Sequence, residues 1–253
     1  MEFISSRNNK KIIDTVKLKD KKFRDQAGMY YFEGRKLFEE AVASNIPVLY
    51  VFVREDCCTK YKNLLDRTDA TIYTVSESVY EKLTDDKAPD GILAVAKKPE
   101  SVFSITGKCF ILSEVRDPGN IGTCIRSARA FGIDTLILHS CADVYSSKII
   151  RSTMGAFFRQ NVIISDDIIS TIDDLCKSGY NVLPTALSEN SIPLSNINLT
   201  TKTVFAVGNE GHGISQDVID KCNGAVIIPM KGDTESLNAS VAASVLMWEM
   251  SKV

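Results

Sequence analysis

Three stretches decide the fold of this 253-residue chain: Asn120-Ile-Gly-Thr-Cys-Ile-Arg126, Gly208-Asn-Glu-Gly-His-Gly213 and Ile228-Pro-Met-Lys-Gly-Asp-Thr-Glu-Ser-Leu-Asn238. Each stretch follows an apolar run typical of a strand and leads into a pattern typical of a helix. In an open α/β sheet, the loops at the carboxyl ends of neighbouring strands converge on one crevice. The three stretches therefore predict one composite site, which offers the side chains of Asn120, Arg126, Glu210, Ser236 and Asn238.

The side chains of this predicted site suggest that the reaction chemistry belongs to a bound cofactor. The five residues include no thiol, no imidazole and no metal-binding cluster, so no metal is expected. The strand predicted at Cys109 to Ser113 leads into a loop with a single glycine, Glu114-Val-Arg-Asp-Pro-Gly119, and not into a G-x-G-x-x-G fingerprint. The sequence also lacks the G-x-x-x-x-G-K-[ST] loop that binds nucleoside triphosphates. When protein groups cannot carry the hard step themselves, a cofactor usually supplies it.

The order and spacing of the three stretches resemble the signature motifs of the SpoU (TrmH-like) branch of the SPOUT RNA methyltransferases. The first motif, N-x-G-x-x-x-R followed by Ala and Phe-Gly, is filled by Asn120, Gly122, Arg126, Ala130, Phe131 and Gly132. The second, G-x-E-x-x-G, is filled by Gly208, Glu210 and Gly213. The third, I-P-M-x-G-x-x-x-S-L-N, is filled by Ile228, Pro229, Met230, Gly232, Ser236, Leu237 and Asn238. The resemblance covers residues 108 to 253, and three motifs in the right order are far more specific than one.

The resemblance implies a SpoU methyltransferase domain over residues 105–253, with a mostly parallel sheet and a deep trefoil knot. Knots are rare, and no residue spacing could show one. The expected cofactor is S-adenosylmethionine, bound by Gly208, Gly213, Ile228, Met230, Gly232, Ser236, Leu237 and Asn238. The implied reaction transfers its methyl group to a ribose 2′-hydroxyl of RNA, with Asn120, Arg126, Glu210, Ser236 and Asn238 as the catalytic set.

Arg126 has the central role in that set. A guanidinium is effectively always protonated, so work as a general base would require an extreme pKa shift. We therefore favour a role in which Arg126 holds the adjacent phosphate and stabilises developing alkoxide charge. Asn120 and Glu210 are expected to orient Arg126 and the motif loops. His212 occupies a position that the family motif leaves unspecified, so a bystander role is expected for it.

Residues 1–98 predict a second, smaller α/β unit, and the polar stretch Lys97-Lys-Pro-Glu-Ser101 is the expected linker. This unit resembles the substrate-binding domain of many SpoU enzymes, which is similar to small ribosomal proteins that bind kinked RNA. Ser6-Arg-Asn-Asn9, Phe32-Glu-Gly-Arg35 and Asp90-Gly-Ile-Leu-Ala-Val95 carry the resemblance. The resemblance therefore implies that the amino-terminal unit binds the RNA substrate.

The distribution of charge supports an RNA contact near the amino end. The whole chain has a net charge of −2, yet residues 1–24 carry eight basic side chains against three acidic ones. Phosphate contacts by such a basic arm supply affinity and not sequence choice. The side chains expected to bind RNA are Arg7, Lys10, Lys11, Lys22 and Arg35.

Apolar runs and turn residues predict an alternation of helices and strands. Helices are expected at 8–24, 35–43, 59–66, 77–83, 121–131, 146–152, 171–178, 215–221 and 237–250. Strands are expected at 30–32, 48–53, 70–75, 91–96, 109–113, 135–139, 161–164, 182–186, 204–207 and 225–228. Such alternation predicts an α/β protein, and in the carboxy-terminal domain it predicts a mostly parallel sheet covered on both faces.

The last predicted helix, 237–250, is apolar around nearly its whole circumference and must be covered on more than one side. SpoU enzymes are homodimers, so a homodimer interface is the expected cover, and other helices of the same chain are the alternative. The seven cysteines include no C-x-x-C pair, and the sequence shows neither a signal segment nor a membrane span. A cytoplasmic protein with reduced thiols is therefore expected.

Two classes of function remain open from the sequence. The first is an RNA ribose 2′-O-methyltransferase, with ribosomal RNA as the expected substrate and tRNA as the nearest alternative. The second is a catalytically silent RNA-binding or assembly protein of the same fold. The complete catalytic set argues against a silent protein, because such a relative would be expected to have lost part of it. The modified nucleotide is not identified by any motif, since base choice depends on RNA shape.

Overall fold

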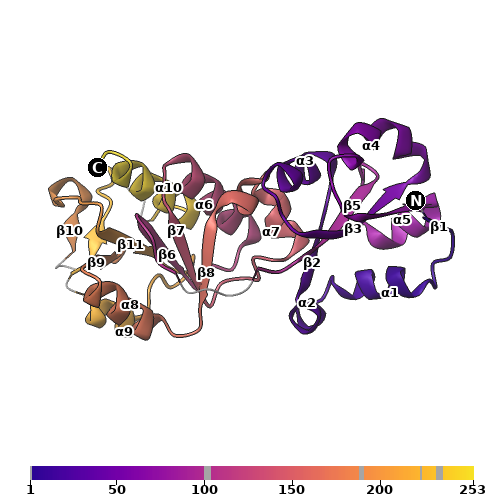
Figure 1. The fold of residues 1–253 in the computed structure, drawn as a ribbon. Helices are drawn as coiled ribbons and strands as arrows, with labels where there is room; N and C mark the ends of the chain where they lie inside the picture. Colours follow the sequence, from indigo (N-terminus) through magenta and orange to yellow (C-terminus); the bar gives the residue numbers. More distant parts are fainter. Residues whose placement is uncertain (1, 100–103, 188–190, 223, 232–235) are drawn as a thin grey trace. The chain divides into compact units, whose positions relative to one another are not determined.

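A computed structural model describes residues 2–99, 104–187, 191–222, 224–231 and 236–253. The chain divides into two compact units, and Figure 1 labels most of their helices and strands. Unit 1 consists of Met1–Glu100 and Asp143–Arg159, and unit 2 of Ser101–Ala142 and Gln160–Val253. The excursion of residues 143–159 into unit 1 is not anticipated by a division of the chain at 1–98 and 105–253.

Unit 1 is built on a five-stranded sheet with the strand order β1-β4-β3-β5-β2. Its strands are β1 (Glu2–Ile4), β2 (Met29–Glu33), β3 (Val48–Arg54), β4 (Thr71–Val75) and β5 (Ile92–Lys97). The strands β1, β4 and β3 are parallel, whereas β5 is antiparallel to both β3 and β2. The sequence does not predict β1, because three residues are too few to show a period.

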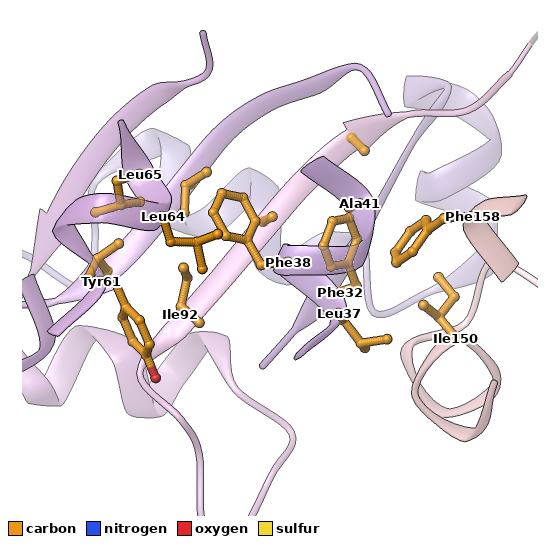
Figure 2. Close-up of a cluster of buried hydrophobic side chains, with 14 of the residues drawn as sticks. Phe32, Leu37, Phe38, Ala41, Tyr61, Leu64, Leu65, Ile92, Ile150 and Phe158 are labelled. Atoms are coloured by element: carbon orange, nitrogen blue, oxygen red, sulfur yellow. The ribbon is translucent and has the colours of Figure 1, made fainter. Parts of the chain in front are cut away.

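Helices cover both faces of this sheet. They are α1 (Lys10–Lys17), α2 (Lys21–Ala27), α3 (Arg35–Ala43), α4 (Cys58–Leu65), α5 (Glu77–Leu83) and α7 (Ser147–Ser152). Successive strand residues point to opposite faces, so Tyr31 joins the core under α1 and α5 while Phe32 joins the core under α3 and α4. Figure 2 shows the core under α3 and α4, in which Ile150 and Phe158, from residues 143–159, pack near Phe32. The excursion is therefore part of the hydrophobic core of unit 1.

The single helix predicted over 8–24 is wrong, because the structure has two helices there. The side chain of Asp20 caps the start of α2. Arg24 is only 4% exposed and donates hydrogen bonds from Nη1 to the carbonyl oxygens of Leu18, at 2.6 Å, and Lys19, at 2.8 Å. These bonds satisfy carbonyl groups that the end of α1 leaves without a helical partner. The cap at Asp20 and the hydrogen bonds of Arg24 therefore stabilise the break between α1 and α2.

Unit 2 contains a second five-stranded sheet, with the order β8-β7-β6-β11-β9. Its strands are β6 (Cys109–Ser113), β7 (Thr135–His139), β8 (Asn161–Ser165), β9 (Asn181–Pro184) and β11 (Thr203–Val207), and all adjacent pairs are parallel. The chain moves outward from β6 through β7 to β8 and later returns to pair β11 with β6. The strand order reverses at this point, so ligands are expected at the carboxyl ends of β6 and β11.

The sheet of unit 2 is covered by α6 (Pro118–Ala130) and α10 (Ala239–Met250) on one face, and by α8 (Ile168–Lys177) and α9 (Gln216–Lys221) on the other (Figure 1). On the latter side, Ile111 and Ile137 pack in one core with Ile172 and Val218. A short parallel pair, β10 (Ile192–Pro193) and β12 (Val226–Ile227), completes the described strands. Three short 3-10 helices, Glu55–Cys57, Ala156–Arg159 and Leu194–Asn196, lie in the described connections. An α/β fold with a mostly parallel sheet is thus confirmed, while the trefoil knot stays a prediction.

Candidate functional site

The first two motifs are joined by the carboxylate of Glu210. Asn120, in the first turn of α6, donates from Nδ2 to Oε1 of Glu210 at 2.9 Å. The backbone amides of Arg116 and Asp117 point at the same carboxylate, at 3.4 and 3.3 Å. Glu210 therefore fastens the loop after β11 to the loop that leads from β6 into α6.

The environment of Glu210 keeps it ionised. Its partial burial opposes the charge, but the hydrogen bonds from Asn120 and from nearby backbone amides lower the pKa of Glu210 below its ordinary value. The carboxylate also lies at the amino end of α6, where the helix dipole favours a negative charge. Such an anion is suited to hold neighbouring groups in place and unsuited to act as a proton donor near neutral pH.

Arg126 lies on α6, about 9 Å along the helix axis from Asn120. Its side chain is exposed, whereas the opposite side of the helix is buried, as the apolar pattern predicts. Within the described part of the chain, Arg126 forms neither a salt bridge nor a side-chain hydrogen bond. The bonds of Glu210 thus orient Asn120 and the start of α6, and they do not reach the guanidinium directly. This leaves the guanidinium available for an external anion.

The second motif forms a closed turn. Asn209 and Gly213 pair through two backbone hydrogen bonds of 3.0 Å each. Gly208 is buried beside this turn, and a Cβ atom at Gly208 would lie 2.3 Å from the backbone of Gly213. A glycine is thus required at position 208 by the turn's own backbone.

The third motif leads into α10, and Asn238 is the residue that caps this helix. Its Oδ1 accepts hydrogen bonds from the backbone amides of Ser240, at 2.9 Å, and Val241, at 3.4 Å. The helix therefore begins at Ala239, two residues later than predicted. Ser236 is exposed and precedes the cap, and Gly232 lies outside the described residues.

Packing within unit 2 brings the helix that follows the third motif against elements that carry the other two. The helix that follows the third motif, α10, packs against α6 and against β11. Ser127 and Ser244 share a hydrogen bond of 2.7 Å between their hydroxyl oxygens, and the rings of Phe131 and Trp248 are 5.6 Å apart. The half-buried side chains of Ile228 and Met230 and the exposed side chain of Leu237 leave apolar surface next to polar loops. Unit 2 contains all of the proposed cofactor-binding residues that the structure describes: Gly208, Gly213, Ile228, Met230, Ser236, Leu237 and Asn238.

Two structural roles near the site are not predicted by the sequence pattern. Asp117 caps α6 by accepting a hydrogen bond from the Asn120 amide at 2.8 Å, so the helix begins at Pro118 and not at residue 121. An Asp followed by Pro is a recognised helix start and could have revealed this cap. The backbone carbonyl of Glu114 and the side chain of Asn209 also connect the motif loops, and no local pattern marks either residue.

The cations of the basic arm differ in their availability. Three lysines are paired with acids: Lys17 with Asp14 at 3.1 Å, Lys19 with Asp85 at 2.8 Å and Lys21 with Asp25 at 2.8 Å. Arg24 is buried and paired with Asp143, while Lys11 lies over the rings of Tyr50 and Tyr73. No salt bridge is formed by Arg7, Lys10 or Lys22 with any residue that the structure describes. These three residues are therefore the cations of the arm that remain free for phosphate.

Arg35 and its neighbours form hydrogen bonds that connect separate segments of unit 1. The guanidinium of Arg35 pairs with Glu39 at 2.7 Å, and its backbone amide donates to Asp90 at 3.0 Å. The amide of Gly34 donates to the carbonyl oxygen of Ile92 at 2.9 Å. Two of the segments that carry the resemblance to a substrate-binding domain are thus bonded to each other.

Metal-binding clusters, disulfides and membrane-spanning helices are all absent from the described residues. In the described ranges, no cluster of three or more His, Cys, Asp or Glu side chains could hold a metal ion. All seven cysteines are free thiols. Among the helices described, none is long and apolar enough to cross a membrane.

Comparison with known proteins identifies relatives of both units. The sequence profile of the SpoU rRNA Methylase family matches residues 108–248. The profile of the MRM3-like substrate binding domain matches residues 9–94.

Relatives also match nearly the whole chain. The 23S rRNA (guanosine(2553)-2′-O)-methyltransferase RlmP of Bacillus subtilis is 34% identical over 251 residues, which is 99% of both proteins. A putative RNA methyltransferase of the TrmH family from Porphyromonas gingivalis superposes with a TM-score of 0.85 at 25% identity, covering 96% of this chain and 97% of that one. An AdoMet-bound rRNA methyltransferase from Sinorhizobium meliloti has the same fold, with a TM-score of 0.88 at 24% identity over 99% of this chain and 97% of that one.

Proposed function

We propose that this chain, which belongs to the SpoU rRNA methylase family and is an RNA ribose 2′-O-methyltransferase, takes its methyl group from S-adenosylmethionine and acts on ribosomal RNA. The observation that carries this function is the meeting of the motif loops where the strand order reverses between β6 and β11. The full-length likeness to an enzyme named for methylation of 23S rRNA favours ribosomal RNA over tRNA. A cytoplasmic location follows from such a substrate.

The proposed cofactor site consists of the turn after β11 and the third motif. S-adenosylmethionine would supply an activated methyl group on a positively charged sulfur. The closed turn from Asn209 to Gly213 offers a fixed backbone edge. Ile228, Met230 and Leu237 offer partly open apolar surface to an adenosyl group. The side-chain oxygen of Asn238 is already used to cap α10, so any contact that it makes with the cofactor must accommodate that bond.

The proposed role of Arg126 is to bind and orient RNA at the reacting ribose. Its exposed guanidinium can form a bidentate contact with a phosphate and can stabilise negative charge that develops on the 2′-oxygen. Because the guanidinium stays protonated, the hydroxyl proton must leave to the phosphate or to water. Asn120 and Glu210 contribute by fixing the start of the helix that carries Arg126.

RNA binding by unit 1 and a homodimer complete the proposed function. The free cations Arg7, Lys10 and Lys22 are the candidate phosphate contacts of unit 1. On α10, Val241 is 48% exposed, and Trp248 is 53% exposed although its ring contacts Phe131 at the end of α6. A second copy of the chain would cover this apolar surface.

The test of the proposed substrate is a map of 2′-O-methyl groups in total RNA, made with and without the gene. We expect one position in ribosomal RNA to lose its methyl group and to regain it when the purified protein and S-adenosylmethionine are added. Loss of a methyl group in tRNA would support the alternative substrate. An unchanged map, together with no transfer in vitro, would support a silent RNA-binding protein.

Replacing Gly208 with valine should weaken S-adenosylmethionine binding at least about ten-fold, because the side chain would collide with the backbone of the turn. The same collision should also lower the melting temperature of the variant. Calorimetric titration of the folded variant measures the affinity. Gly211→Ala is the matched control, since a Cβ there meets only Asn209, at 3.4 Å. Equal affinities for Gly208→Val and wild type would place the cofactor elsewhere.

A further inference from the structure

Glu114 is the point at which the two motif loops and the neighbouring strand meet. It follows β6 and has a φ of +60°, a left-handed conformation that non-glycine residues rarely adopt. Its backbone amide donates to the carbonyl oxygen of His139, at the end of β7, at 2.8 Å. Its own carbonyl oxygen accepts from Nδ2 of Asn209 at 2.9 Å, and its carboxylate lies 3.5 Å from Nε2 of His212. Such a backbone conformation persists only when its surroundings hold it.

Asn209 uses both ends of its side-chain amide. While Nδ2 reaches across to Glu114, Oδ1 accepts from the backbone amides of Gly211, at 2.8 Å, and His212, at 3.4 Å. The main chain of Asn209 also makes both bonds that close the turn with Gly213. A side-chain amide offers a donor and an acceptor together, which a carboxylate cannot do. An asparagine is therefore required at position 209, because its amide donates to one loop and accepts from the other.

We propose that Asn209 is a positioning residue for methyl transfer, which sets the turn of the second motif against the end of β6 by its bond to the Glu114 carbonyl. The inference rests on the proposed function, since that turn is the proposed cofactor edge. Asn209 acts through the turn. The turn itself is closed by backbone bonds to Gly213, so loss of the Nδ2 bond should leave the turn formed and remove one of its two attachments to the chain that follows β6, while the bonds of Glu210 remain.

The effect of this attachment should appear in cofactor binding more than in global stability. Glu210 lies one residue further along, and its carboxylate holds Asn120 and the start of α6. Without the Asn209 bond, only the Glu210 carboxylate would hold the turn against the loop after β6, so the turn could tilt and misplace both the cofactor edge and this carboxylate. Misplacement raises the entropic cost of forming the bound arrangement.

The deciding variant is Asn209→Ser, which keeps a short oxygen to accept from the turn amides and removes the donor that reaches Glu114. We expect its dissociation constant and KM for S-adenosylmethionine to rise about three- to ten-fold, as the loss of one hydrogen bond implies. The KM for RNA and the melting temperature should stay close to wild type. Asn209→Asp also lacks the donor and places a carboxylate oxygen against the Glu114 carbonyl, so it should weaken cofactor binding at least as much, and it serves if the serine variant does not fold.

Glu114→Gln is the matched control. It removes the charge that faces His212 but keeps the backbone carbonyl to which Asn209 donates, so we expect wild-type cofactor affinity. Wild-type affinity in Asn209→Ser or Asn209→Asp would overturn the inference. Equal weakening in Glu114→Gln would also overturn it, because the side-chain pair would then be the attachment. If wild-type protein neither binds S-adenosylmethionine nor methylates RNA, the proposed function fails, and the inference fails with it.

Discussion

Replacing Arg126 with alanine should lower the rate of RNA methylation by about 10³-fold, while the affinity for S-adenosylmethionine stays within a few-fold. The guanidinium is exposed and makes no bond within the described chain, so its removal should not disturb α6. Its proposed partners are a phosphate and the developing charge on the 2′-oxygen, both of which belong to the RNA. The measurements are single-turnover methylation of an RNA fragment and calorimetric titration of the cofactor.

Two further variants show whether the geometry or merely the charge of Arg126 is needed. Arg126→Lys should remain nearly inactive, because an ammonium group lacks the planar fork that binds phosphate in two places. Arg129→Ala is the matched control, since Arg129 is an exposed arginine on the same helix. We expect Arg129→Ala to retain most activity. Turnover close to wild type in Arg126→Ala or Arg126→Lys would remove Arg126 from the reaction.

The strands and helices that could be predicted from the sequence are those with a long, regular pattern. The unbroken apolar run at Cys109–Ser113 and the period of Glu77–Leu83 give the observed bounds. The strands Glu2–Ile4 and Ile192–Pro193 are too short to show a pattern, and pairing with neighbouring strands defines them. Local patterns describe segments, whereas tertiary pairing can override or extend them.

Two features of unit 1 depend on contacts between residues distant in sequence. The buried guanidinium of Arg24 binds Asp143, 119 residues later, and it also covers the carbonyl groups where α1 ends. Nothing in the lysine-rich run from 8 to 24 distinguishes this arginine from exposed neighbours. Likewise, Phe158 reads as an ordinary apolar residue of the second domain, yet it contacts Phe32 in unit 1. Charge and hydropathy alone do not specify such partners.

The sequence predicts which residues belong to the candidate site, but it does not predict the hydrogen bonds that connect them. Motif spacing selected Asn120 and Glu210, and the structure joins them at 2.9 Å. Asn209 lies at a position that the motif leaves open, but its side chain donates to the backbone of Glu114, which follows β6 and lies 95 residues away in sequence. Glutamate is not a residue type that indicates a left-handed backbone, so the sequence does not predict the conformation of Glu114. Hydrogen-bond partners of this kind are decided by the fold.

Replacing the three free cations of the basic arm should weaken RNA binding far more than replacing paired cations. The variant carries Arg7→Gln, Lys10→Gln and Lys22→Gln. If each side chain contacts one phosphate, the slope of log affinity against log salt should fall by about 2 to 3, and the affinity near 0.1 M salt should fall on the order of a hundred-fold. Cofactor affinity and the proposed dimer should be unaffected, because neither involves these residues.

The matched control removes the same charge from paired lysines, by Lys17→Gln, Lys21→Gln and Lys177→Gln. Each of these lysines already pairs with an aspartate at 2.8 to 3.4 Å. They should therefore contribute less than the free cations to the release of counterions when RNA binds. The test is the salt dependence of binding to one RNA fragment, measured for wild type and both triple variants. Equal slopes in the two variants would mean that net charge alone attracts the RNA. An unchanged slope in the Arg7, Lys10 and Lys22 variant would make the arm a solvated helix surface and would assign RNA binding to other residues of the chain.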